Sequence, residues 1–271
     1  MEFFIKIIGT FLAGIMCLFF YARYLEHKSL YYPVLEIEHT PKDLGIEYDD
    51  ILFNTKDNVR LNGWLVRAPN SKGTILFAHG NGGNIGHCLD KIAFFNKLGF
   101  NVFTFDYRGY GKSQGSSSEK GLYLDIKAAY KFINDKNLGV PIVVYGESLG
   151  GAIAIDLAAR NDITIAGLIV EGTFTSIEDM AKTIYPMLPG FLLKTKFDSI
   201  GKISKIKVPK LHFHAQDDNI VPFTLGRELF KAADNPKKFI ILEGVHNDCF
   251  FISEDLVKSS LVEFINSIVS D

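Results

Sequence analysis

A serine stands between two glycines at the spacing Gly-x-Ser-x-Gly, over residues 146–150, with Ser148 at its centre. The motif follows an apolar run at 142–145 and precedes a run of small residues at 151–155 that is typical of a helix. A serine on a tight turn between a strand and a helix presents its hydroxyl above the sheet edge, where a base and a substrate can both reach it. The pattern therefore predicts that Ser148 is a nucleophile.

A nucleophilic serine needs a base and an acid that orients the base, each placed after a later strand. The strand predicted at 209–214 opens into a loop with Asp217 and Asp218, and the strand predicted at 239–242 is followed by His246. The imidazole of His246 is suited to accept the serine proton and to return it to the leaving group, while a carboxylate holds its other ring N–H. An acid and a histidine thus occur in the order that this chemistry requires.

Together these segments resemble an α/β-hydrolase, and more narrowly the membrane-anchored serine hydrolases that include lipid esterases and protein-depalmitoylating thioesterases. The resemblance covers nearly all of the chain beyond its N-terminal apolar segment. The segments that carry it are HGNGGN at 79–84, DYRGYGKS at 106–113, the serine motif, and the stretches at 214–222 and 244–248. It implies an α/β fold with a mostly parallel eight-stranded sheet, helices on both faces and a short cap insertion.

The resemblance also assigns the acid. The family usually writes this segment as His-Gly-x-x-Asp-x-x-Val-Pro, and the spacing selects Asp218, which leaves Asp217 as a solvated neighbour. The catalytic residues that it implies are therefore Ser148, Asp218 and His246.

Two backbone N–H groups are expected to form an oxyanion hole. The first belongs to Leu149, directly after the serine and at a helix N-terminus, where the helix dipole favours negative charge. By resemblance the second belongs to Asn81, or to Gly82 if the loop is shifted by one residue. We expect His79, in the same loop, to be a packed anchor and not a catalytic group.

Other polar residues allow weaker alternatives. His212 and His214 alternate on one strand, so they face the same side and allow a metal site, but no further ligand set is visible. Arg108 and Lys112 lie in a glycine-rich loop and allow anion binding, whereas we favour a bracing role for Arg108 together with Asp106. We expect neither a metal nor a cofactor, and the sequence gives no role to Glu147.

Composition sets the broad limits. The chain has 271 residues, 47% hydrophobic and 22% charged, which describes a folded protein. A formal net charge of −2 and the lack of a basic stripe argue against a nucleic-acid partner. The three cysteines, Cys17, Cys88 and Cys249, lack the spacing of a disulfide framework. Because Cys17 falls in the apolar N-terminal run, at most one disulfide could join Cys88 and Cys249, and we favour free buried thiols over it.

The first 24 residues are mostly apolar and approach the length that spans a bilayer. We therefore predict a single-pass signal anchor over 1–24, with membrane localisation, and a linker over 25–45. A cleaved signal peptide is the competing interpretation, but no Ala-x-Ala site follows the apolar run. Lysine and arginine residues on both sides leave the orientation open.

The rest of the chain is predicted to be one α/β-hydrolase domain over 46–271, with alternating strands and helices. An apolar insertion at 173–208 lies where the cap of this fold enters, and its short length predicts a small lid. We expect the cap to admit an acyl chain, although its apolar residues could equally pack on the sheet.

These observations predict a serine hydrolase that cleaves carboxylic ester or thioester bonds of small acyl or lipid-like substrates through an acyl-enzyme. A peptidase or amidase is the nearest alternative, because the same triad serves amides. From a different class, a catalytically silent binding or scaffold protein of the same fold remains the second alternative.

Overall fold

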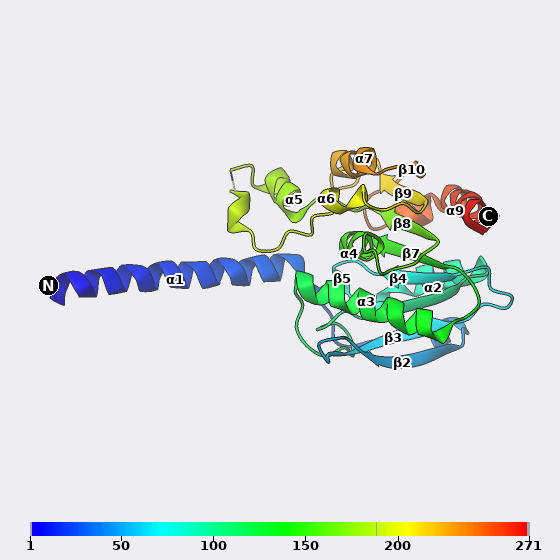
Figure 1. Ribbon diagram of the computed structural model, residues 1–271, viewed down its shortest axis with the longest axis horizontal. Coiled ribbons are helices and arrows are strands. Elements are labelled where there is room, and N and C mark those ends of the chain that lie inside the picture. Colours follow the sequence, from blue (N-terminus) through cyan, green and yellow to red (C-terminus); the bar gives the residue numbers. More distant parts are fainter. Residues whose placement is uncertain (1, 188, 270–271) are drawn as a thin grey trace.

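A twisted sheet of eight strands forms the centre of the molecule in the computed structural model, which describes residues 2–187 and 189–269 (Figure 1). The strand order is β10-β9-β8-β7-β4-β6-β3-β2, and only the pairs β2–β3 and β3–β6 are antiparallel. Its strands are β2 (Tyr48–Asn54), β3 (Arg60–Val66), β4 (Thr74–Ala78), β6 (Asn101–Phe105), β7 (Ile142–Glu147), β8 (Gly167–Glu171), β9 (Lys210–Ala215) and β10 (Lys237–Leu242). The predicted fold, a mostly parallel eight-stranded sheet, is confirmed.

Helices cover both faces of this sheet, as the alternation of strands and helices predicted. One apolar core lies between the sheet and α3 (Glu119–Lys136), α4 (Leu149–Ala158) and α7 (Phe223–Ala232). The second core lies between the sheet and α2 (Leu89–Lys97), α8 (Cys249–Ile252) and α9 (Glu254–Val269). Because both faces of the central strands are covered, β4 and β6 are buried along their whole length.

Two helical regions are divided in the structure. The first starts as the 3₁₀ helix η2 (Ile85–Cys88), which leads into α2 and whose N-cap Asn84 accepts a hydrogen bond from the Gly86 N–H. The second, at the end of the described chain, breaks at Ser253 between α8 and α9. There the Ser253 hydroxyl accepts a hydrogen bond from the Glu243 N–H at 2.9 Å, which ties the break to the end of β10.

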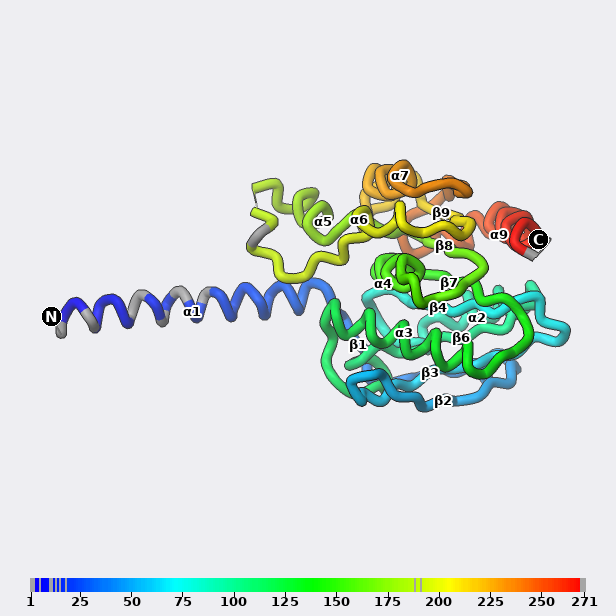
Figure 2. The backbone as a smooth tube through the Cα atoms, viewed as in Figure 1, coloured from blue at the N-terminus to red at the C-terminus, as the bar shows by residue number. Residues whose placement is uncertain are grey.

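The N-terminal helix α1 (Glu2–Leu30) extends away from the sheet domain, whereas α9 lies on the far side (Figure 2). The helix continues past residue 24, where the sequence analysis placed the end of an anchor, and Met1 of that anchor lies outside the described residues. Among the described residues, no helix combines the length and the apolar character that crossing a membrane requires.

The segment predicted as a linker, 25–45, contains the end of α1 and residues that pack on the domain. Tyr31, directly after α1, is 4% exposed and packs in the first apolar core. The strand β1 (Tyr32–Pro33) then pairs in parallel with β5 (Gly82–Gly83), which makes a second, two-stranded sheet.

The predicted cap, 173–208, contains α5 (Ile177–Ile184), η3 (Gly190–Leu192) and α6 (Ile200–Ile203); its residue Leu188 lies outside the described residues. The base of the cap packs on the first core through Ile177 and Phe197. Large apolar side chains at its tip, by contrast, are exposed, and Met187 reaches 94%.

The cap also contacts α1. The Glu26 carboxylate of α1 accepts hydrogen bonds from the backbone N–H of Lys194 at 3.3 Å and of Thr195 at 2.6 Å. Arg23 donates to the Leu192 carbonyl and pairs with Glu26 at 2.7 Å. The end of α1 and the cap are thus joined by charge-assisted hydrogen bonds.

Candidate active site

Ser148 lies on a strained turn between β7 and α4. Its φ of 51° and ψ of −116° are unusual for a residue with a side chain, and the α4 helix begins at the next residue. A β-carbon on Gly146 would lie 2.4 Å from the Gly150 carbonyl oxygen, and one on Gly150 would lie 2.0 Å from the Ala78 oxygen. Both glycines are therefore required for the turn that presents Ser148 at the sheet edge.

His246 and Asp218 form a hydrogen-bonded pair. The His246 Nδ1 atom lies 2.7 Å from Asp218 Oδ2, and these side chains are 7% and 1% exposed. The other carboxylate oxygen of Asp218 accepts the backbone N–H groups of Ile220 and Val221, at 2.9 and 2.7 Å. Burial alone would raise the pKa of Asp218, but the bonds from His246 and the two N–H groups outweigh it and lower that pKa. Asp217 is exposed, so Asp218 is the acid that faces the histidine.

The end of β8 brings this pair and the serine turn together. The Ser148 N–H donates to the Glu171 carbonyl at 2.8 Å. A β-carbon on the next residue, Gly172, would lie 3.0 Å from His246 Cε1 and 3.5 Å from Asp218 Oδ2. Among the described residues, no hydrogen bond joins the Ser148 hydroxyl to His246. The end of β8 thus contacts the serine turn through Glu171 and the His246–Asp218 pair through Gly172.

The loop after β4 lies against the serine turn. A β-carbon on Gly80 would lie 3.9 Å from Ser148 Cβ. Leu149 occupies the first position of α4, where a backbone N–H has no partner within the helix. Asn81 is held through its carbonyl, which accepts the Tyr110 hydroxyl at 2.8 Å, and through its side-chain amide, which donates to the Leu30 carbonyl at 3.3 Å. Neither contact engages the Asn81 N–H that the sequence assigned to an oxyanion hole.

The segment after α1 supports this same loop, and the sequence analysis did not anticipate it. The Tyr32 N–H donates to the Asn81 carbonyl and the Val34 N–H to the Gly83 carbonyl, both at 3.0 Å. The Asn84 amide, which is 1% exposed, donates to the carbonyls of Val34 and Glu36 at 3.1 and 2.6 Å. A two-residue strand has no periodicity, so no sequence pattern could predict this pairing.

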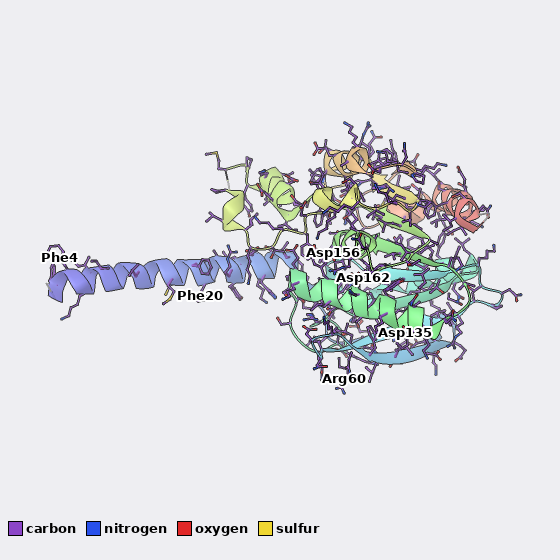
Figure 3. All side chains as sticks on the ribbon, in the orientation of Figure 1. Phe4, Phe20, Arg60, Asp135, Asp156 and Asp162 are labelled. Carbon is purple, nitrogen blue, oxygen red and sulfur yellow. The ribbon has the colours of Figure 1, made fainter. Side chains whose placement is uncertain are left out.

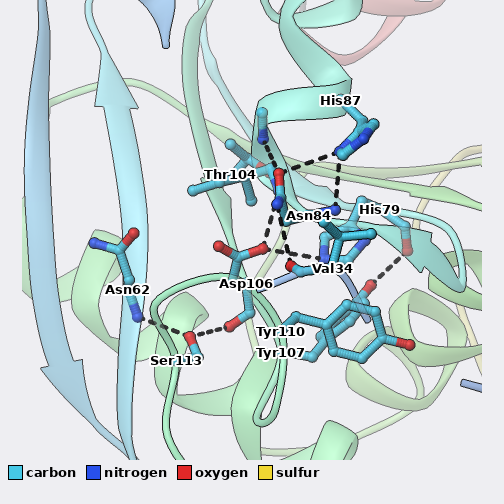
Figure 4. Close-up of polar contacts among 12 residues, drawn as sticks. Val34, Asn62, His79, Asn84, His87, Thr104, Asp106, Tyr107, Tyr110 and Ser113 are labelled. Carbon is cyan, nitrogen blue, oxygen red and sulfur yellow. Dashed lines mark hydrogen bonds and ion pairs between the residues drawn. The ribbon is translucent and has the colours of Figure 1, made fainter. Parts of the chain in front are cut away.

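Buried polar groups brace the loop from below (Figure 4). Asp106 Oδ1 accepts the Ile85 N–H at 2.9 Å, and burial raises the Asp106 pKa to about 7. His79 packs on the Tyr107 ring at 4.3 Å between centroids and accepts the Tyr107 hydroxyl at its carbonyl, at 2.7 Å. Burial lowers the His79 pKa to about 4, so its ring is neutral near pH 7. Both residues anchor the loop, in agreement with the role that the sequence favoured.

Arg108 also serves as a brace. Its guanidinium bonds Asp125 at 2.9 Å and Asp57 at 2.8 Å, while its backbone N–H donates to Asp125 as well. Two carboxylates thus neutralise the Arg108 guanidinium, which leaves little attraction for an external anion. This pairing agrees with the predicted role of Arg108 as a brace of the loop.

His212 and His214 have different surroundings. His212 is 2% exposed and packs against Phe230 and Phe239, and burial lowers its pKa to about 3. His214 Nε2 lies 3.0 Å from the Val221 carbonyl and 3.4 Å from Asp218 Oδ2, so it supports the acid loop. In the described part of the chain, no three metal-binding side chains cluster together.

The cysteines are free thiols. Cys249 is buried, Cys88 is half-buried, and Cys17 is exposed on α1.

Comparison with known proteins is consistent with this architecture. Residues 69–200 match the family described as serine aminopeptidase, S33. Protein bem46 of Schizosaccharomyces pombe is 40% identical over 235 residues, which cover 79% of this chain and 77% of bem46. The alpha/beta hydrolase domain-containing protein WAV2 of Arabidopsis thaliana is 32% identical over 285 residues, covering 95% of this chain and 91% of WAV2. A solved Pyrococcus furiosus esterase shares the fold, with a TM-score of 0.73 at 24% identity over 88% of this chain and 99% of that one.

Proposed function

Since the chain belongs to the α/β-hydrolase family together with bem46 and WAV2, we propose that it is a serine hydrolase of carboxylic ester or thioester bonds. The observation that carries the proposal is the bond of 2.7 Å between His246 and Asp218 beside the strained turn of Ser148. A base oriented by a buried acid, next to a serine on such a turn, is the arrangement that activates a hydroxyl.

In the proposed mechanism, the Ser148 oxygen attacks the substrate carbonyl while His246 accepts the serine proton. Asp218 holds the histidine tautomer and stabilises the imidazolium. The backbone N–H groups of Leu149 and Asn81 donate to the tetrahedral oxyanion. The leaving group then takes the proton from His246, and water, activated by the same ring, releases the acid from the acyl-enzyme.

Substitution of Ser148 tests this proposal. We expect Ser148→Ala to lower turnover of a p-nitrophenyl ester by at least about 10³-fold, because the nucleophile is gone. The melting temperature should stay close to that of the wild type, since the hydroxyl is only half-buried. A fluorophosphonate probe should label the wild type and not the variant. An unlabelled, inactive wild type would instead favour the silent scaffold alternative.

For the substrate, we propose an ester or thioester with an apolar acyl chain. The exposed tip of the cap supports this, because Ile184, Tyr185 and Met187 are 65%, 64% and 94% exposed. Monomeric proteins rarely leave such groups together without a binding role. A series of p-nitrophenyl esters from acetyl to palmitoyl measures the preference. A constant kcat/KM along the series would contradict the acyl proposal.

An amide substrate is the second candidate, because the matching family is described as a serine aminopeptidase. Amino-acid p-nitroanilides assayed beside the esters decide between the two. Faster Ser148-dependent cleavage of the anilides than of every ester would establish the peptidase alternative.

We further propose that α1 contacts a lipid surface. Phe4 and Phe20 lie on the part of α1 that extends away from the domain, and they are 69% and 63% exposed (Figure 3). An apolar helix surface of this kind is favourable only against another apolar phase. The full chain should float with phosphatidylcholine vesicles, and Phe4→Ser/Phe20→Ser should float less. Equal flotation of both would refute the contact.

A further inference from the structure

Two neighbouring strands end on glutamates directly beneath the serine turn. Glu147 ends β7 and Glu171 ends β8, and the two are register partners in the parallel pair. The Glu171 side chain is 3% exposed and that of Glu147 is 26% exposed. Two carboxylates this close repel one another, and burial weakens the solvation of both. A cation is therefore needed for both to stay ionised.

Lys91, on α2, supplies this cation. Its Nζ lies 2.8 Å from Glu147 Oε2, and 3.0 and 3.1 Å from the two oxygens of Glu171. The ammonium also lies 4.8 Å from the centre of the Phe250 ring. Burial alone would lower the pKa of Lys91, but the two carboxylates raise it, so the group stays charged. The Tyr145 hydroxyl also donates to Glu171.

These bonds join the three parts of the site. Helix α2 follows the loop that contains Asn81, so the bonds of Lys91 restrict where that loop can lie. Glu147 directly precedes Ser148 in the chain. Glu171 accepts the Ser148 N–H at its carbonyl and directly precedes Gly172, which lies against His246. One ammonium group thus connects the loop, the serine turn and the strand end beside the histidine.

We propose that Lys91 is a positioning residue of the hydrolytic site, which holds the oxyanion loop at a fixed distance from the nucleophile. This inference rests on the proposed function. Oxyanion donors act only when they lie close to 3 Å from the developing charge, and a displacement of about 1 Å costs on the order of 100-fold in rate. Without the ammonium, the two carboxylates repel or take up a proton, and the polar link between α2 and the two strand ends is lost, so that only apolar packing joins them.

A purely stabilising role is the alternative, and Lys210 is the matched control for it. Lys210 is 1% exposed, and its ammonium donates to the carbonyls of Ile206 and Val208 at 2.9 and 2.8 Å. It lies at the start of β9, whereas Asp218 follows the other end of that strand. Lys210→Met therefore removes a buried, hydrogen-bonded ammonium at the opposite edge of the sheet from the site.

The experiment compares Lys91→Met, Lys91→Arg and Lys210→Met in the full chain, below the melting temperature of each. Functional sites are counted by titration with a fluorophosphonate, so that unfolded protein does not enter kcat. For Lys91→Met we expect kcat per titrated site to fall by about 10- to 100-fold with KM changed little. Lys91→Arg should restore part of kcat, because a guanidinium also bonds both carboxylates. Lys210→Met should keep the kcat of the wild type.

A wild-type kcat per site in Lys91→Met would overturn the inference and leave the network as a stabilising feature. An equal loss in Lys210→Met would do the same. If Lys91→Met does not fold, the double variant Lys91→Met/Glu171→Gln takes its place. It removes the repulsion between the two carboxylates but does not restore the link between α2 and the strand ends. A wild-type kcat in this double variant also rejects the inference. A wild type without Ser148-dependent hydrolysis is a different result, since it rejects the proposed function itself.

Discussion

At the scale of single residues, neighbouring side chains of the same type have different environments. Asp217 and Asp218 are adjacent in sequence, but only Asp218 turns into the protein and reaches His246. His212 and His214 both lie on β9, but only His214 approaches the acid. Chemical type therefore restricts the candidates, and local burial selects among them.

This difference predicts the outcome of a matched pair of substitutions. We expect Asp218→Asn to lower kcat by about 10³- to 10⁴-fold, because the amide no longer holds the productive tautomer of His246. Asp217→Asn removes the same charge from an exposed side chain and should leave kcat within about twofold. Steady-state kinetics on a p-nitrophenyl ester measures both. Similar losses in the two variants would mean that the acid has been assigned to the wrong residue.

At the scale of elements, the segment between α1 and the domain is part of the proposed site. Its strand β1 pairs with the loop that contains Asn81. The Asn84 amide donates hydrogen bonds to two carbonyls of the segment, those of Val34 and Glu36. The end of α1 in turn bonds the cap through Glu26. The N-terminal region therefore contacts both the proposed oxyanion loop and the predicted cap.

A substitution at Asn84 tests this support. We expect Asn84→Ala to lower kcat about tenfold, since the loop loses its ties to the carbonyls of Val34 and Glu36. The loss of buried hydrogen bonds should also cost about 1–3 kcal/mol of stability. Asn101→Ala is the control: Asn101 is buried and accepts the Ala68 N–H, but it lies at the opposite end of the sheet. Asn101→Ala should keep the kcat of the wild type at a similar loss of stability. A wild-type kcat in Asn84→Ala would contradict the proposal that the segment after α1 supports the oxyanion loop.

At the scale of the whole molecule, buried histidines make folding depend on pH. Burial lowers the pKa of His212 to about 3, below its ordinary value of 6.5. The unfolded chain therefore binds a proton between these values that the folded chain does not. Stability from this group is present above pH 6.5 and is lost as the pH falls towards 3. His79, with a pKa near 4, acts in the same direction. Asp106 acts in the opposite direction, because burial raises its pKa to about 7. The stability that Asp106 contributes to the folded state is present at low pH and is lost as the pH rises through 7.

His212→Phe isolates one of these contributions, because the site is already lined by Phe230 and Phe239. On moving from pH 7.5 to pH 5, the wild type should lose about 2 kcal/mol through His212, and the variant should lose that much less. Urea unfolding at the two pH values measures the difference. The same pH dependence in both proteins would show that His212 titrates normally.

Much of the fold follows from local pattern. Apolar runs at 142–145, 209–214 and 239–242 located β7, β9 and β10, since strand and helix periods differ and the flanking turns are short. The serine motif fixed its own turn, because Gly146 and Gly150 leave no room for a side chain. The acid and the histidine each follow a predicted strand. Because parallel strands bring their carboxyl ends to one edge of the sheet, the sequence predicted that these two residues lie near one another.

Tertiary structure alone decided the remaining contacts. The pairing of β1 with β5 joins residues about fifty positions apart through two residues each, and the contacts among Lys91, Glu147 and Glu171 join three separate elements. Such contacts depend on which elements become neighbours after folding, and no repeat along the chain records them. The sequence by itself determined the elements and the residues able to do chemistry. Only packing in three dimensions decided which buried cation joins α2 to the ends of β7 and β8, because those contacts link elements that are distant in the chain.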